Sequence, residues 1–558
     1  MNTMNSKIII KKVRELIVIA TLYSWNHYIK ERIQDNTDYE IEDFDEEKMA
    51  FIDYEIIKVL KSLVNNEKYY TFSLITKTFE ERRVLDYSLV NTREHLSCDS
   101  SKISYQNFRK TKFEEIMKKI LVYHSSLIHP IFGIFKGHYR GIADSMPLIA
   151  VDAKLGRRSY DAYGRASSYN ESYYTGVLEA LERFHGVAPQ DSKTIIMSED
   201  ELKKLKMEYL PMKKFNHYGK ENYELKTFEF NEYSSKKKIR WRSTFDYNKK
   251  REVLIPEQII YFSNEQFYKD GSEERYIAET SNGTAIGSTW EEAAIVSLME
   301  VIERDSFLVH WYTKSPPIKL DNIESYPDTD IQLMLAYLEM IDYKVHLFDI
   351  TLESRIPAYW VLLEYKGDND ENLAFYTAAG ANINPIAAIK SALIEAATSI
   401  KVFKAYMYKK YTESELLNLK RNYLNVNKLE DHLYLFSSKE MRKHLEFALN
   451  TPKHTDIVLS IQSYQADNGR RITQGELLEE LLNRITQNHK EIFISDLSNA
   501  FLRDMGLSCT KIHIPTLQNI GFGMQYQNIN RDRLEQAVKI NKLEGDFKVL
   551  TNVPHPFP

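Results

Sequence analysis

Two segments that share one acidic pattern constrain this chain more than any other feature of its sequence. The pattern Glu-x-x-Glu-Arg occurs at residues 179–183 and again at residues 300–304, each time among apolar residues that indicate a helix. Residues three apart lie on one helical face about 5–6 Å from each other, so each copy points two carboxylates at a common spot. Such a pair needs a cation, water or a raised pKa, and burial increases that need.

The second segment adds a third acidic residue to the same side of its helix. Glu292 precedes Glu303 by about three turns of 3.6 residues, and Glu300 lies about 80° around the axis. Apolar residues lie within or beside this sector: Val296, Met299 and Phe307. Converging carboxylate oxygens are what Mg²⁺ and its nucleotide phosphates require. A surface helix whose arginine balances the glutamates remains an equal alternative at this point.

A turn-rich stretch at residues 281–288 precedes the second helix. Asn282 and Gly283 would let the backbone approach a ligand closely, although a plain turn explains them too. The chain has no Walker Gly-x-x-x-x-Gly-Lys-Ser/Thr loop here and no dinucleotide Gly-x-Gly-x-x-Gly fingerprint. It also lacks a Gly-x-Ser-x-Gly elbow and a His-Glu-x-x-His zinc motif. The usual ATP-binding and hydrolase folds are therefore unsupported.

Length and charge limit the remaining choices. A chain of 558 residues exceeds what one hydrophobic core usually serves, so we expect two or more domains. The net charge of −5 supplies no broad basic surface, which argues against nucleic acid as a partner. Two cysteines, Cys98 and Cys509, make neither a zinc cluster nor a disulfide framework.

The N-terminal region differs from the remainder in its residue pattern. Residues 1–118 predict a separate, smaller and mainly helical module, with one amphipathic helix over about residues 7–33. The apolar run after Lys11 and Lys12 is too short for a bilayer and lacks a signal-peptide cleavage pattern, so we expect a cytoplasmic protein without a membrane partner. This module's role stays open, partner binding being one possibility.

The region from residue 119 to 558 alternates short β-rich runs, such as residues 147–151 and 358–363, with apolar helices. That alternation predicts an α/β to α+β catalytic body with mixed sheets. A Lys- and Arg-rich stretch at residues 233–251 is interpreted as a solvated hairpin rather than a polyanion site.

Together these segments resemble the YcaO family, in particular the streptolysin-type D component of azole and azoline biosynthesis. The resemblance covers about residues 119–558. It includes Thr175 before the first acidic helix, the Asn-Gly-x-Ala-x-Gly turn at 282–287, and the Glu-Arg-Asp ending of the second helix. A third element resembles residues 379–382 followed by 392–397, and a late strand pair resembles residues 496–498 and 512–515.

The last five residues strengthen the resemblance. Pro554, Pro556 and Pro558 form the Pro-x-Pro-x-Pro ending of azoline-forming members, and the family assigns this tail a catalytic part. Alternating prolines make a stiff extended tail that could deliver a carboxylate into a pocket. A frayed tail with accidental prolines is the alternative.

The resemblance implies a YcaO-type ATP-binding fold and an ATP-dependent cyclodehydratase that forms thiazoline or oxazoline rings from Cys, Ser or Thr of a ribosomal precursor peptide. The implied Mg²⁺ ligands are Glu179, Glu182, Glu292, Glu300 and Glu303. The implied nucleotide-binding residues are these five with Arg183, Asn282, Arg304 and Glu395. The implied partners are the precursor peptide, a separate ThiF-like leader-binding protein, a flavin dehydrogenase of the same complex, and a second copy of the chain.

Some positions depart from the family pattern. Thr398 and Lys401 replace a frequent glutamine and arginine, while Thr516 and Gln518 replace a glycine and glutamate. These changes leave a second hypothesis open, a YcaO-like scaffold that binds peptide or partner without turnover. Other members of the family form thioamides or amidines, and the proline tail favours azolines instead.

Overall fold

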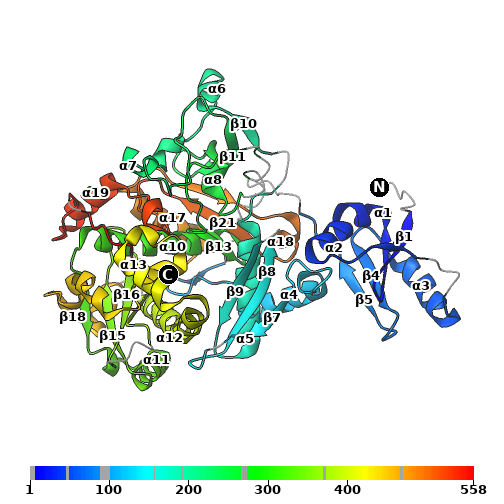
Figure 1. The fold of residues 1–558 in the computed structure, drawn as a ribbon, viewed down its shortest axis with the longest axis horizontal. Coiled ribbons are helices and arrows are strands. Elements are labelled where there is room, and N and C mark those ends of the chain that lie inside the picture. Colours follow the sequence, from blue (N-terminus) through cyan, green and yellow to red (C-terminus); the bar gives the residue numbers. More distant parts are fainter. Residues whose placement is uncertain are drawn as a thin grey trace.

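The computed structural model describes residues 7–44, 49–87, 101–141, 143–155, 158–189, 193–264, 268, 271, 273–367, 372–465, 469–548 and 550–557. The chain is a mixed α/β protein in which several antiparallel or mixed sheets alternate with helices (Figure 1). The fold class predicted from the sequence is therefore confirmed. No helix of the described residues is both long enough and apolar enough to cross a lipid bilayer.

The N-terminal region carries a five-stranded antiparallel sheet in the order β3-β1-β2-β4-β5. Its strands are β1 (Ile8–Val13), β2 (Leu16–Thr21), β3 (Glu42–Asp43), β4 (Lys68–Ser73) and β5 (Phe79–Arg83). Its helical segments are α1 (Leu22–Ser24), the π-helix η1 (Trp25–Ile29), α2 (Lys30–Asn36) and α3 (Phe51–Leu63).

Two expectations for this region are wrong. The helix expected over residues 7–33 begins only at Leu22, and the module is a sheet with flanking helices rather than mainly helical. Both strands of the first hairpin are rich in Ile and Val, whose branched side chains favour strands. Arg14 turns the chain between them with a φ of 54°.

A three-stranded antiparallel sheet supports the first acidic helix. Its strands are β7 (Gly137–Arg140), β8 (Leu148–Leu155) and β9 (Arg158–Arg165), and α5 (Tyr169–His185) packs on β8 and β9. Figure 1 shows this sheet and α4 (Phe113–Leu127) between the N-terminal region and the rest of the body. Residues of the first hairpin, β8 and α5 share one buried cluster.

A six-stranded sheet carries the turn and the helix of the second acidic pattern. Its order is β10-β11-β20-β21-β13, with β12 paired to β11. Its strands are β10 (Ile195–Met197), β11 (Ile239–Asp246), β12 (Arg251–Pro256), β13 (Thr284–Gly287), β20 (Phe493–Asp496) and β21 (Ser508–His513). Helix α10 (Trp290–Thr313) packs on β13 and β21 and is buried on nearly all sides.

The expected late strand pair is confirmed as antiparallel β20 and β21. The hairpin expected at residues 233–251 is confirmed as β11 and β12. It is not solvated throughout, because Arg240 and Arg242 are buried against Glu257.

A second five-stranded sheet lies on the other side of α10, in the order β17-β16-β15-β14-β18. Its strands are β14 (Ile318–Asp321), β15 (Tyr343–Asp349), β16 (Ala358–Tyr365), β17 (Phe375–Ala381) and β18 (His454–Asp456). Helix α12 (Pro385–Lys410) packs on β16 and β17 and on α11 (Thr329–Met340). A small pair joins β6 (Ile103–Ser104) to β19 (Arg471–Ile472).

The remaining α-helices cover the outer faces of the sheets. They are α6 (Glu199–Lys204), α7 (Lys220–Tyr223), α8 (Glu257–Ile260), α13 (Glu413–Arg421), α14 (Leu429–Leu435), α15 (Glu446–Leu449), α16 (Ile457–Ser463), α17 (Gln474–Thr486), α18 (Ala500–Asp504) and α19 (Arg531–Asn541). Helix α4 runs across position 118, and the division of the chain at that position stays a prediction.

Candidate active site

Helix α5 carries the first acidic pair. The Ser168 side chain caps its start by accepting from the Glu171 N–H, and Gly186 caps its end. Glu179 accepts a hydrogen bond from the Tyr163 N–H of β9 at 3.0 Å and lies 3.4 Å from Arg183. The helix is thus fixed to its sheet through the predicted site residue itself.

Helix α10 carries the second pair. Its Glu300 accepts the Gly283 N–H at 3.0 Å, which ties the helix to the predicted turn. Gly283 has a φ of 76°, and a Cβ there would lie 2.6 Å from the Val301 side chain, so glycine is required. Arg304 lies 3.5 Å from Glu303 and 4.0 Å from Glu300.

The acidic residues of the two helices face one another. Burial raises the pKa of Glu182 to about 8; Arg183 opposes this shift, and the charges of Glu300 and Glu179 add to it. Burial likewise raises the pKa of Glu300, where Arg304 and Arg183 act in the opposite direction. Because Glu182 and Arg183 of α5 both interact with Glu300 of α10, the structure brings the two patterns into one cluster.

Helix α12 adds a third acidic element. Burial raises the pKa of Glu303 to about 7, against the attraction of Arg304 and with repulsion from Glu395 and Glu300. Asn384 caps α12 by accepting the Ile386 N–H, and Pro385 occupies its first turn, where no amide donor is needed. Glu395 therefore lies near Glu303 of the second pair.

A cavity of 620 Å³ opens on this cluster. Its lining residues come from α10, the start of α12, the end of β17 and the loop at 106–109: Gln106, Asn107, Phe108, Arg109, Val296, Met299, Glu300, Glu303, Ala381, Asn382, Asn384, Ala387 and Ser391. Ligand sites in proteins commonly have volumes of about 300–1,000 Å³ and combine apolar walls with a few convergent polar groups. This cavity has that size and character.

Two predicted residues lie at the margin of the cluster. Glu292 is eight residues before Glu300, about 12 Å along the axis, and its carboxylate accepts from the Ser288 hydroxyl at 2.5 Å. Asn282 donates to the Asn519 side chain at 3.2 Å. Its Oδ1 is buried and has no hydrogen-bond partner within the described segments.

The sequence did not identify Lys511, which belongs with these residues. Lys511 of β21 is 4% exposed, donates to the Thr280 carbonyl at 2.6 Å and feels the charge of Glu300. Burial lowers its pKa to about 8. A lysine in the middle of a fully buried strand was the available signal, but a strand by itself does not say what its side chains face.

The proline tail is built into the body. Pro554, His555, Pro556 and Phe557 are buried, which contradicts the frayed-tail alternative. The Thr377 hydroxyl donates to the Pro556 carbonyl at 3.2 Å. The Phe557 ring lies 4.1 Å from the Arg304 guanidinium carbon. The predicted site residue Pro558 lies outside the described residues, as does Cys98.

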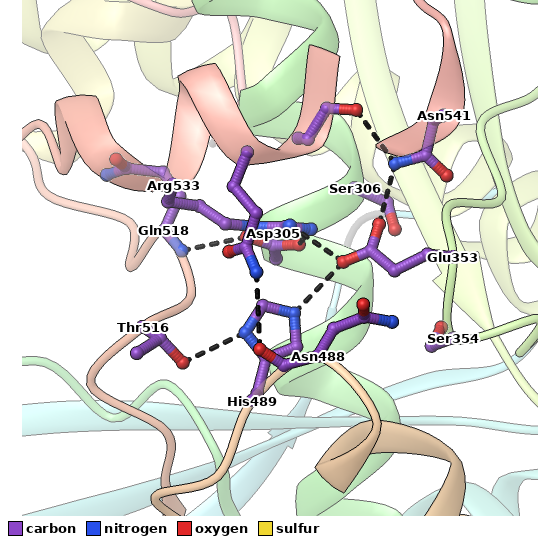
Figure 2. Close-up of polar contacts among 12 residues, drawn as sticks. Asp305, Ser306, Glu353, Ser354, Asn488, His489, Thr516, Gln518, Arg533 and Asn541 are labelled. Atoms are coloured by element: carbon purple, nitrogen blue, oxygen red, sulfur yellow. Dashed lines mark hydrogen bonds and ion pairs between the residues drawn. The ribbon is translucent and has the colours of Figure 1, made fainter. Parts of the chain in front are cut away.

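The residues that depart from the family pattern make hydrogen bonds or ion pairs with residues outside the acidic cluster. Thr398 donates to the Ile394 carbonyl of its own helix at 2.7 Å, and Lys401 pairs with Asp144. Thr516 bonds His489, and the Gln518 N–H donates to Asp305, the last residue of the Glu-Arg-Asp ending (Figure 2).

The donor set fits Mg²⁺ and a polyphosphate. Within the described ranges, no three His, Cys, Asp or Glu side chains converge closely enough to hold a metal by themselves. A Mg²⁺ site here would therefore need the phosphates and water that usually complete the coordination of this ion beside one or two carboxylates. Arg304 Nη1 is buried without a hydrogen-bond partner in the described chain, so a donor is available for an anion.

Partly buried carboxylates of α5, α10 and α12 lie near Arg183, Arg304 and Lys511, and two of them, Glu300 and Glu303, line the cavity. Such a set can bind Mg²⁺ and a polyphosphate on a chain that has neither a Walker nor a dinucleotide motif. Residues 163–518 match the family described as "YcaO cyclodehydratase, ATP-ad Mg2+-binding". A search of curated proteins found no match.

Three similar solved structures share this fold at low identity. A heterocyclase in complex with substrate and cofactor is 16% identical, with a TM-score of 0.69 over 99% of this chain and 77% of that one. The heterocyclase TruD is 16% identical, with a TM-score of 0.56 over 93% and 72%. YcaO from Methanopyrus kandleri, bound with AMPPCP and Mg²⁺, is 15% identical, with a TM-score of 0.52 over 74% and 93%.

The chain belongs to the YcaO cyclodehydratase family, since the family match covers more than half of its length. It is an ATP-dependent, Mg²⁺-binding cyclodehydratase.

Proposed function

We propose that this cyclodehydratase forms azoline rings in a ribosomal precursor peptide, with the cluster of Glu179, Glu182, Glu300 and Glu303 as its phosphoryl-transfer site. The observation that carries the proposal is that these partly buried acids lie close to one another and to Arg183 and Arg304. A heterocyclase of the same fold, solved in complex with substrate and cofactor, supports the proposal.

The proposed chemistry removes one water from the peptide for each ring. The thiol of Cys or the hydroxyl of Ser or Thr loses its proton as it attacks the preceding amide carbonyl, and the amide oxygen takes the γ-phosphoryl group of ATP. That oxygen then leaves as phosphate, the amide nitrogen loses its proton, and a C=N bond closes the thiazoline or oxazoline. ADP and phosphate are the other products.

Each charged residue has a defined task in this proposal. The glutamates would hold the ATP phosphates through Mg²⁺, with one or two carboxylates on an ion, and the bound Mg²⁺ would supply positive charge for the transferred group. Glu395 lies close enough for its charge to raise the pKa of Glu303, and it stays a predicted nucleotide contact. Arg183, Arg304 and Lys511 would face phosphate oxygens, because preorganised cations in a dry site stabilise developing charge most strongly. Glu292 and Asn282 stay predicted nucleotide contacts.

The tail has a positional task. Phe557 packs on Arg304 and lies 4.9 Å from Phe307 of α10. We propose that Pro554, Pro556 and Pro558 stiffen this segment so that it holds the Arg304 guanidinium against Glu300 and Glu303. The catalytic part of Pro558 remains a prediction from the family pattern.

Partner proteins complete the proposal. We propose that a separate leader-binding protein of the ThiF-like class presents the precursor peptide, that a flavin dehydrogenase oxidises the azolines, and that the chain acts as a homodimer. The first can be tested by adding each candidate protein from the same genetic neighbourhood to the purified chain.

The deciding experiment combines the purified chain with Mg-ATP, the leader-binding protein and short peptides rich in Cys, Ser and Thr that are encoded in the same genetic neighbourhood. We expect phosphate release together with the loss of one water mass per ring by mass spectrometry. Glu300→Gln should lower ring formation on the order of 100-fold, because it removes one charged group from the transition-state environment.

Glu413→Gln, the same change on the exposed surface of α13, is the matched control and should leave ring formation unchanged. Equal ring formation by both variants would contradict the proposed site. Mg-ATP binding without turnover on any peptide would instead favour the scaffold hypothesis that Thr398 and Lys401 leave open.

A further inference from the structure

His432 of α14 connects two backbone segments that are distant in sequence. Its Nε2 accepts the Gly523 N–H at 2.7 Å, and its Nδ1 lies 2.8 Å from the His555 carbonyl oxygen. The imidazole is fully buried. One side chain therefore bonds both the loop after β21 and the proline tail.

The two bonds determine where the proton of His432 lies. An N–H of the backbone can only donate, so Nε2 must be the bare nitrogen and the proton must be on Nδ1. Nδ1 then donates to the His555 carbonyl, which accepts. Burial lowers the pKa of His432 to about 4, in agreement with this neutral form. His432 is therefore neutral and donates its only ring N–H, on Nδ1, to the His555 carbonyl of the tail.

His555 completes an enclosed aromatic contact. Its ring lies tilted against that of His432 with centroids 4.3 Å apart, and Phe522 meets both rings edge-on. His555 Nε2 donates to the Gly521 carbonyl at 3.0 Å. The tail is consequently bonded to the 521–523 loop in two ways, directly and through His432.

The residues that follow His555 lead straight to the proposed site. Pro556 is held by Thr377 of β17, and Phe557 is next, against Arg304. Proline at 554 and 556 restricts the chain on both sides of the bond from His432. A displacement of the His555 carbonyl is therefore transmitted to Phe557 rather than absorbed.

We propose that His432 is a positioning residue for phosphoryl transfer, which fixes the proline tail so that Phe557 holds Arg304 against Glu300 and Glu303. This inference rests on the proposed function. In this proposal the hydrogen bond from Nδ1 to the His555 carbonyl positions the tail. The bond that Nε2 accepts from the Gly523 N–H holds only the 521–523 loop.

Two substitutions separate these bonds. In His432→Asn the side-chain amide nitrogen takes the place of Nδ1 and keeps the donor to His555. In His432→Gln the side-chain oxygen takes the place of Nε2, keeps the acceptor for Gly523 and removes the donor to the tail. We expect His432→Gln to lower kcat roughly 10- to 100-fold, because small misplacements of charged groups cost that much, with KM for ATP within about twofold. His432→Asn should restore most of the lost kcat.

Deuterium exchange of the peptide covering residues 551–557 gives a readout that needs no turnover. We expect faster exchange there in His432→Gln than in His432→Asn, with equal exchange in α5 and α10 and similar midpoints of thermal unfolding. Should the chain form no rings at all, the proposed function fails, and this exchange pattern still tests the seating of the tail.

Three results would overturn the inference. One is equal loss of kcat in both variants, and another is full activity in His432→Gln with a protected tail. The third comes from combining His432→Gln with Phe557→Ala: if His432 acts through Phe557, the first change should add little to the second, so full additivity contradicts the proposal.

Discussion

At the scale of single residues, Arg304 joins the parts of the site. Its guanidinium lies within 4.0 Å of Glu300 and 3.5 Å of Glu303 and stacks on Phe557. The delocalised plane of arginine suits both contacts, since it stacks on a ring and presents several donors in a fixed fork. A lysine would keep the charge and lose the fork.

We therefore expect Arg304→Lys to weaken binding of Mg²⁺ with a non-hydrolysable ATP analogue about tenfold, because a point charge does not replace an arginine that stacks on a ring and presents several donors. Isothermal titration measures this directly. Arg421→Lys, on the exposed end of α13, provides the control and should bind as the wild type does. Unchanged affinity in Arg304→Lys would argue against a phosphate contact.

At the scale of elements, α10 is fixed on the side away from its glutamates by a buried ion network (Figure 2). Arg533 of α19 donates to both oxygens of Asp305, at 2.9 and 2.6 Å, and to Glu353 at 2.7 Å. His489 and Asn541 also bond Glu353. Because Asp305 follows Arg304 directly, this network fixes the part of α10 that carries the proposed site residues.

Replacing Arg533 by Met should destabilise the chain by about 3–5 kcal/mol, because it leaves two buried carboxylates without their cation. The midpoint of thermal unfolding is the measurement. Arg531→Met removes an arginine two residues earlier on the same helix, where the side chain is exposed, and should change the midpoint little. Equal midpoints for both variants would show that the network contributes no stability.

At the scale of the whole molecule, buried titratable groups link folding to pH in opposite directions. Burial lowers the pKa of His310 on α10 to about 4, whereas burial raises the pKa of Glu182 to about 8. As pH falls below 6.5, the unfolded chain protonates His310 while the folded chain does not, so this histidine reduces stability down to about pH 4. Glu182 acts with the reverse sign, so only a comparison of variants isolates one group.

We expect the stability lost in His310→Asn to shrink as pH falls from 7 to 5, because asparagine keeps the bond to the Ser306 carbonyl and cannot be protonated there. Calorimetric unfolding at several pH values tests this. His27 makes the same bond to the Tyr23 carbonyl four residues earlier at an exposed position, so His27→Asn is the control for the change of side chain. A cost of His310→Asn that grows on acidification would contradict the assigned direction.

The sequence by itself determined the local parts of this protein. The pattern of Glu, Arg and apolar residues predicted α5 and α10 with their carboxylates on one face, because the period of a helix is fixed. Likewise the β-rich runs predicted β8 and β16. The Asn-Gly motif predicted a turn, and the structure shows that its Gly283 N–H bonds Glu300. The strand-forming content of residues 8–21 was also present, but apolar periodicity over a short run does not separate helix from strand.

Only the tertiary structure decided which of these parts meet. It brought Glu182 to Glu300, added Lys511 from a late strand, placed Glu292 two turns away, and seated the proline tail between α14 and Arg304. Contacts between residues hundreds of positions apart depend on how sheets and helices pack, and spacing along the chain carries no information about that.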